Sequence, residues 1–148
     1  MMMRFHYLDT SALAKRYAPE TGSDAVDAII AAKDHVSVLG NISLTELYSA
    51  LSKKCRVGEI SRSDMLSAVL RFEKDMSSGI FRFLEIDNDI INASKRLILA
   101  YPALRTYDSL HLALALELSA LDPVVVTSDL VLYETCQSEG LQVLNPEK

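Results

Sequence analysis

The sequence predicts an α/β fold in which helices cover both faces of a central parallel sheet of about five strands. Short hydrophobic runs of strand length alternate along the chain with segments of helical periodicity. One run, residues 124–126, is an uninterrupted valine triplet, typical of a strand buried on both faces. No linker rich in Pro, Gly or Ser divides the 148 residues, so we expect residues 1–148 to form a single domain.

The elements follow from these runs in chain order. Strands are expected at residues 5–8, 35–39, 80–86, 123–127 and 141–144. About seven helices are expected, at residues 10–18, 22–33, 43–56, 61–76, 87–101, 107–121 and 129–138. No strand separates the third helix from the fourth, and Gly58 lies at their turn. We therefore expect residues 43–77 to form a helical hairpin that binds a partner or a second copy of the chain.

Composition narrows the class of protein. With 15 Lys and Arg against 20 Asp and Glu, the net charge is −5, so any nucleic acid must be held locally. The two cysteines, Cys55 and Cys136, lie outside any C-x-x-C spacing and are expected to be small buried residues, not a disulfide or a zinc site. No apolar run resembles a signal peptide or approaches the roughly 18 residues of a membrane span, which predicts a cytoplasmic protein with no membrane partner.

Four acids occupy junctions between predicted strands and helices: Asp9, Glu46, Asp108 and Asp129. Ligands of open parallel sheets bind at the carboxyl ends of the strands, so these acids are expected to meet at one edge. Each has an alternative role in helix capping, as an N-cap or a first-turn anion. This alternative is strongest for Glu46, because Ser43-Leu44-Thr45-Glu46 matches the S-x-x-E capping box.

The joint pattern favours a metal site. Four carboxylates at one edge would repel one another, and a hard divalent cation, Mg²⁺ or Mn²⁺, would compensate. A set without His or Cys argues against zinc. One or two such ions would polarise a phosphoryl oxygen and lower the pKa of a bound water, which is the chemistry of phosphodiester hydrolysis.

The segments around these acids resemble the PIN-domain nucleases, specifically the small VapC-type toxins of toxin–antitoxin pairs. The resemblance is carried by "YLDTSAL", "ISLTELYSAL", "LRTYDSLHLALAL" and "VVVTSDLVLYE", spread over almost the whole chain. It implies a PIN-like three-layer domain, Mg²⁺- or Mn²⁺-dependent cleavage of RNA, homodimers, and a cognate antitoxin that inserts near the site. By position it makes Asp9, Glu46, Asp108 and Asp129 the catalytic, metal-binding residues. Some relatives have a further acid close to the third, where this chain has Ser109 and His111.

Other functions account for the pattern less well. A phosphoacceptor domain would need a second acid beside Asp9 and a lysine after the 123–127 strand, and a dehalogenase-type phosphatase would need D-x-D; the chain has neither. A PIN-like module that binds RNA or protein without cutting it remains the alternative. His111 is either a general acid or a packed core residue, and Tyr107 or Arg105 is a candidate RNA contact.

Overall fold

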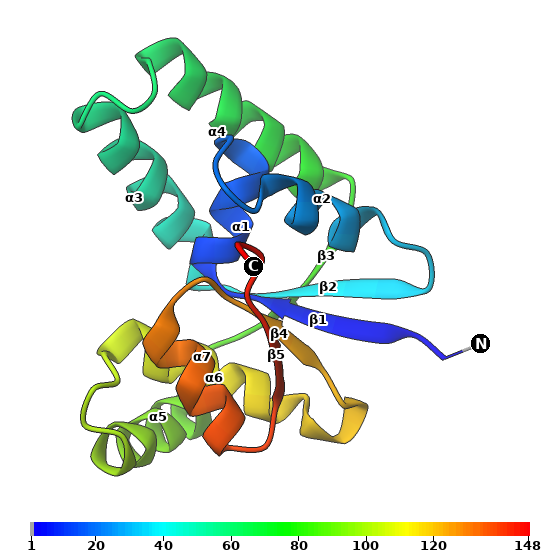
Figure 1. Ribbon diagram of the computed structural model, residues 1–148, viewed down its shortest axis with the longest axis vertical. Helices are drawn as coiled ribbons and strands as arrows, with labels where there is room; N and C mark the ends of the chain where they lie inside the picture. Colours follow the sequence, from blue (N-terminus) through cyan, green and yellow to red (C-terminus); the bar gives the residue numbers. More distant parts are fainter. Residues whose placement is uncertain (1) are drawn as a thin grey trace.

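A five-stranded parallel sheet organises the computed structural model, which describes residues 2–148 (Figure 1). The strands are β1 (Arg4–Leu8), β2 (His35–Gly40), β3 (Phe81–Leu84), β4 (Val124–Val126) and β5 (Gln142–Leu144). Their spatial order is β3-β2-β1-β4-β5, so β1 is the central strand. In the register, Tyr7 pairs with Val38 on one side and Val125 on the other. The predicted parallel sheet is confirmed.

Seven α-helices cover the sheet. They are α1 (Thr10–Tyr17), α2 (Ser23–Ala31), α3 (Ser43–Arg56), α4 (Arg62–Ser77), α5 (Asn88–Ala100), α6 (Thr106–Glu117) and α7 (Leu130–Ser138). Figure 1 shows α1 to α4 on one face of the sheet and α5 to α7 on the other, which gives the predicted three layers. Helix α6 is shorter than predicted: a 3-10 turn at Ser119–Leu121 follows it, and Pro123, two residues after that turn, has no N–H with which to continue a helix.

Side chains alternate along β1 and build a hydrophobic core on each face of the sheet. Tyr7 and Leu8 are both fully buried but point to opposite faces. Leu8 packs into the core shared with α1 to α4, whereas Tyr7 packs into the core shared with α5 to α7. Because β1 is buried on both faces, its carboxyl end is held rigidly, and the next residue along the chain is Asp9.

Helices α3 and α4 form the predicted hairpin, which extends away from the sheet in Figure 1. Its turn contains Gly58, whose φ of 82° is a conformation that side-chain-bearing residues rarely adopt. The hairpin exposes several large hydrophobic side chains, namely Tyr48, Val57, Leu66 and Leu70. Its predicted use as a partner surface stays a prediction.

The predictions about the two cysteines and about membrane spans can be compared with the structure. Cys55 and Cys136 are both free, as predicted, and burial raises the pKa of the Cys136 thiol to about 12. Cys136 is fully buried, whereas Cys55 is only partly buried. Within residues 2–148, every helix is too short or too polar to cross a membrane.

Candidate active site at the carboxyl edge of the sheet

Asp9 lies directly after β1 and caps helix α1. Its Oδ1 accepts hydrogen bonds from the Ala12 N–H (2.9 Å) and the Ser11 hydroxyl (2.7 Å), and its Oδ2 accepts one from Thr127 (2.6 Å). Burial raises the pKa of Asp9, while His111 and these hydrogen bonds favour the charged form. The capping alternative is therefore correct for Asp9, but it does not exclude a second role, because capping uses only Oδ1.

Thr127 joins Asp9 to Asp129. Its hydroxyl donates to Asp9 and accepts the backbone N–H of Asp129 at 3.0 Å. Asp129 is itself the N-cap of α7, with Oδ1 accepting the Leu132 N–H at 2.9 Å. The two acids are brought together because β1 and β4 are parallel neighbours whose carboxyl ends coincide.

Glu46 is not part of a capping box, so that prediction is wrong, although Glu46 does lie in the first turn of α3, where the helix dipole favours an anion. The N-cap of α3 is Ile42, which makes no side-chain cap, and the Ser43 hydroxyl instead bonds Thr10 at 2.9 Å. Glu46 Oε1 accepts hydrogen bonds from the Thr10 hydroxyl at 2.6 Å and from His111 Nε2 at 2.8 Å. Burial alone would raise the pKa of Glu46, but these two bonds outweigh it and lower the pKa below its ordinary value. Glu46 is therefore bonded to side chains of α1 and α6 and not to the backbone at the start of its own helix.

His111 is buried between Glu46 and Tyr7. Only 3% of its side chain is exposed, and its Nδ1 lies 2.6 Å from the Tyr7 hydroxyl. Burial raises the pKa of Tyr7 well above its ordinary value, so the phenol keeps its proton. Sequence reasoning missed this Tyr7–His111–Glu46 chain because its members are far apart in the sequence: 104 positions separate Tyr7 from His111, and 65 separate His111 from Glu46.

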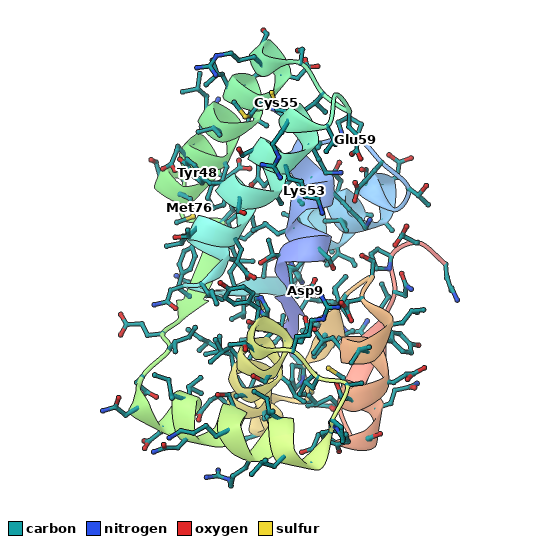
Figure 2. All side chains as sticks on the ribbon, turned by 90° about the vertical axis from the view of Figure 1, so that its left-hand side faces the viewer. Asp9, Tyr48, Lys53, Cys55, Glu59 and Met76 are labelled. Carbon is teal, nitrogen blue, oxygen red and sulfur yellow. The ribbon has the colours of Figure 1, made fainter. Side chains whose placement is uncertain are left out.

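Asp108 lies in the first turn of α6, whose N-cap is Arg105. Burial, followed by the charges of Asp129 and Asp9, raises the pKa of Asp108 to about 6, and Glu46 adds to this rise. Repulsion of this kind acts only between charges that lie close together, so Asp108 lies near the other three acids. Figure 2 shows Asp9 where the two halves of the molecule meet, below the α3–α4 hairpin.

The donor set suits a hard cation, although the side chains are not gathered around one point. Within residues 2–148, no three His, Cys, Asp or Glu side chains are placed closely enough to hold a metal ion. The hydrogen bonds at Glu46 and Asp129 each use a single carboxylate oxygen, Oε1 and Oδ1. The second carboxylate oxygens of Glu46 and Asp129 could therefore bind a divalent cation. Such a cation would also offset the negative charge that raises the pKa of Asp108.

A cavity of about 470 Å³ lies beside Glu46. Its lining residues are Thr10, Ile42, Thr45, Glu46, Ser49, Ala50, Lys53 and Tyr107. Tyr107 precedes Asp108 in the chain and is 59% exposed. Of the two candidate RNA contacts, Tyr107 lines this cavity and Arg105 is not among its lining residues.

Comparisons with known proteins identify the fold. The family model described as "PIN domain" matches residues 6–138. The solved structure of FitAcB from Neisseria gonorrhoeae is 18% identical, with a TM-score of 0.67 over 95% of this chain and 97% of that chain. A toxin–antitoxin complex from Klebsiella pneumoniae is 17% identical, with a TM-score of 0.63 over 95% and 97%.

A third solved structure, Mycobacterium tuberculosis VapC20, is described as a Sarcin-Ricin loop cleaving toxin. It is 15% identical to this chain, with a TM-score of 0.61 over 81% of this chain and 86% of its own. No curated protein sequence matches. At these identities the structural likenesses establish the fold alone.

Proposed function

Because the chain belongs to the PIN domain family, we propose that it is a metal-dependent endoribonuclease and the toxin of a type II toxin–antitoxin pair. The observation that carries the proposal is the gathering of acids at the carboxyl edge of the sheet, where Thr127 bonds both Asp9 and the backbone of Asp129. The raised pKa of Asp108, caused by burial and by the charges of the other three acids, supports it. Asp9 is buried and the other three acids are partly buried. Clustered carboxylates of this kind destabilise a fold, so such a cluster at a sheet edge is typical of a functional site.

In this proposal Asp9, Glu46, Asp108 and Asp129 hold one or two Mg²⁺ or Mn²⁺ ions. The bound cation would polarise a phosphoryl oxygen and lower the pKa of a water that attacks the phosphodiester. Thr127 keeps Asp9 and Asp129 in a fixed relation, since its hydroxyl bonds to both residues. Thr10 does the same for Glu46 and the start of α3.

The cavity beside Glu46 supports single-stranded RNA as the substrate. The exposed ring of Tyr107 offers a face for base stacking, and Lys53 offers a cation for a phosphate. Figure 2 shows Lys53 on α3, between the end of the hairpin and Asp9. These contacts are local, which accords with a chain whose net charge of −5 gives no general attraction for nucleic acid. VapC20, described as a Sarcin-Ricin loop cleaving toxin, gives a precedent in the same fold.

The protein partners follow from the same neighbours. We propose a cognate antitoxin, since one structural neighbour is a toxin–antitoxin complex. We also propose a homodimer in the cytoplasm, on the strength of the family resemblance alone. The chain would act as a single PIN-like domain, with the exposed hydrophobic side chains of the 43–77 hairpin as a contact surface.

The test is cleavage of a pool of single-stranded and structured RNAs by purified protein with Mg²⁺, Mn²⁺ or EDTA. Asp9→Asn should abolish cutting, because Asn keeps the cap but removes the charge. Asp87→Asn is the matched control, because Asp87 also caps a helix, through the Ile90 N–H at 2.9 Å, and takes no part in the acid cluster. Cutting that is insensitive to EDTA or to Asp9→Asn would contradict the proposal, and no cutting at all would support the non-catalytic binding module.

A further inference from the structure

A buried chain of hydrogen bonds runs from the core to Glu46. It begins at the Tyr7 hydroxyl on β1, passes through both ring nitrogens of His111 on α6, and ends at Glu46 Oε1 on α3. Tyr7 is fully buried and His111 almost so. Two side chains from different elements are thus fixed in place behind one carboxylate of the acid edge.

One proton of this chain can be assigned from its partners. A carboxylate only accepts hydrogen bonds, so the proton between His111 and Glu46 Oε1 belongs on His111 Nε2. The Tyr7 hydroxyl lies 2.6 Å from His111 Nδ1, and a phenol can donate or accept a hydrogen bond there. His111 therefore has a hydrogen-bond partner at each ring nitrogen, and among residues 2–148 no buried side-chain polar atom lacks a partner.

The two donors to Glu46 converge on the same oxygen. Thr10 at 2.6 Å and His111 at 2.8 Å both bond Oε1. They approach from α1 and α6, so together they fix the rotation of the carboxylate group. Glu46 Oε2 makes no hydrogen bond within residues 2–148, and the side chain is 20% exposed.

The space for this chain depends on a glycine. A Cβ at Gly40 would lie 2.8 Å from the Tyr7 hydroxyl oxygen and 2.5 Å from Leu114 Cδ1, closer than such contacts ever occur. The absence of a side chain at the end of β2 therefore admits the Tyr7 hydroxyl to its position beside His111.

We infer that His111, held by Tyr7, is a positioning residue that orients Glu46 so that its free carboxylate oxygen is presented to a divalent cation. The inference rests on the proposed function in requiring that Glu46 binds a metal ion. Groups that hydrogen-bond a metal ligand from behind fix its direction, and their removal weakens metal binding about 10- to 100-fold. His111 would then act through Glu46 and would not touch the RNA.

The experiment measures Mn²⁺ binding to the purified full chain by calorimetry, and RNA cleavage separately. His111→Leu should raise the Kd for Mn²⁺ at least about tenfold. In RNA cleavage it should lower kcat and change KM by a smaller factor. His111→Gln can place an amide N–H near the Nε2 position and should recover most of the affinity. Tyr7→Phe, which removes only the hydroxyl, should lie between Gln and Leu.

The control is His35→Leu, because His35 is also hydrogen-bonded but lies at the start of β2, at the opposite end of that strand from Gly40. It should leave the Mn²⁺ affinity unchanged, and circular dichroism with thermal unfolding should show that each variant is folded. An unchanged Mn²⁺ affinity in folded His111→Leu would overturn the inference, as would equal losses in the Gln and Leu variants.

The two proposals fail in different ways. Wild-type protein that binds Mn²⁺ but cuts no RNA contradicts the nuclease, while the variants still test His111 by affinity. Wild-type protein that cuts RNA, with His111→Leu equal to it in both readouts, contradicts the role of His111 and leaves the nuclease intact. Wild-type protein that binds no Mn²⁺ contradicts both.

Discussion

Helices α3 and α4 begin with the same kind of sequence, a serine followed three residues later by an acid. In α4 the motif forms a complete capping box: Ser61 Oγ accepts the Asp64 N–H at 3.0 Å, and Asp64 accepts the Ser61 N–H at 3.4 Å. In α3 neither bond forms, because Thr10 engages both Ser43 and Glu46.

The difference shows under what conditions a capping-box motif in the sequence forms a capping box in the structure. The α4 motif is exposed to solvent and meets no competing donor, so its own backbone is its best partner. The α3 motif starts at the buried carboxyl edge of the sheet, where side chains of α1 and α6 offer short hydrogen bonds. An acid drawn away from its own helix by distant donors is a better candidate for function than one that caps it.

The largest expected effect is on activity, and it separates the two acids. Glu46→Gln should lower RNA cleavage more than about 100-fold, since loss of a ligand should exceed the 10- to 100-fold loss that follows removal of a group behind one. Asp64→Asn, the equivalent change in the real capping box, should leave cleavage within about twofold. Rates measured at saturating Mn²⁺ with both variants check this. Equal effects of the two substitutions would show that the diverted acid is only structural.

Asp108→Asn should stabilise the protein, whereas Asp64→Asn should not. Asp108 is destabilising when ionised, because its pKa is raised to about 6 from an ordinary 3.8. In EDTA the folded protein therefore loses stability as pH rises from about 4 to about 6, and Asp108→Asn should remove this loss. Above pH 6 the gain should be about 1 to 3 kcal/mol, and it should vanish below about pH 4.

Urea unfolding at pH 4 and pH 7 in EDTA measures that gain, with Asp64→Asn as the control. The control removes an acid from an exposed cap and should not stabilise the protein at either pH. A stabilisation by Asp108→Asn that is the same at both pH values would show that repulsion among the acids is not its cause.

The same comparison shows what the sequence could predict. Periodicity and strand-length runs were enough for the parallel sheet and its helices, because those patterns report burial of each face directly. The position of acids after strands was enough to predict that Asp9 and Asp129 lie at the carboxyl edge. The links through Thr127, Thr10 and His111 could not be predicted, since they join residues far apart in the chain and leave no local pattern.

Two glycines extend the comparison between the edge and the hairpin. Gly40→Ala should destabilise the protein by about 1 to 3 kcal/mol, because the added Cβ meets Tyr7 and Leu114 in a packed core. Gly58→Ala, at the hairpin turn, meets no atom within 4 Å and should cost about 1 to 2 kcal/mol through its φ of 82° alone. Only Gly40→Ala should also weaken Mn²⁺ binding. If both weakened it equally, the Tyr7 hydroxyl would have no part in the site.

The smallest effect tests the capping box itself. Ser61→Ala should lower the free energy of unfolding by about 1 kcal/mol, because it leaves the first turn of α4 without its side-chain acceptor. Ser63→Ala, at an exposed position two residues later in the same helix, is the control and should change stability by less than about 0.5 kcal/mol.

Ser43→Ala should behave differently from both: it removes the hydroxyl that bonds Thr10, and Thr10 also holds Glu46, so Mn²⁺ affinity should fall with little loss of helix. Chemical unfolding of the three variants, paired with Mn²⁺ titration, would show whether one motif in this chain serves stability and its counterpart serves the acid edge.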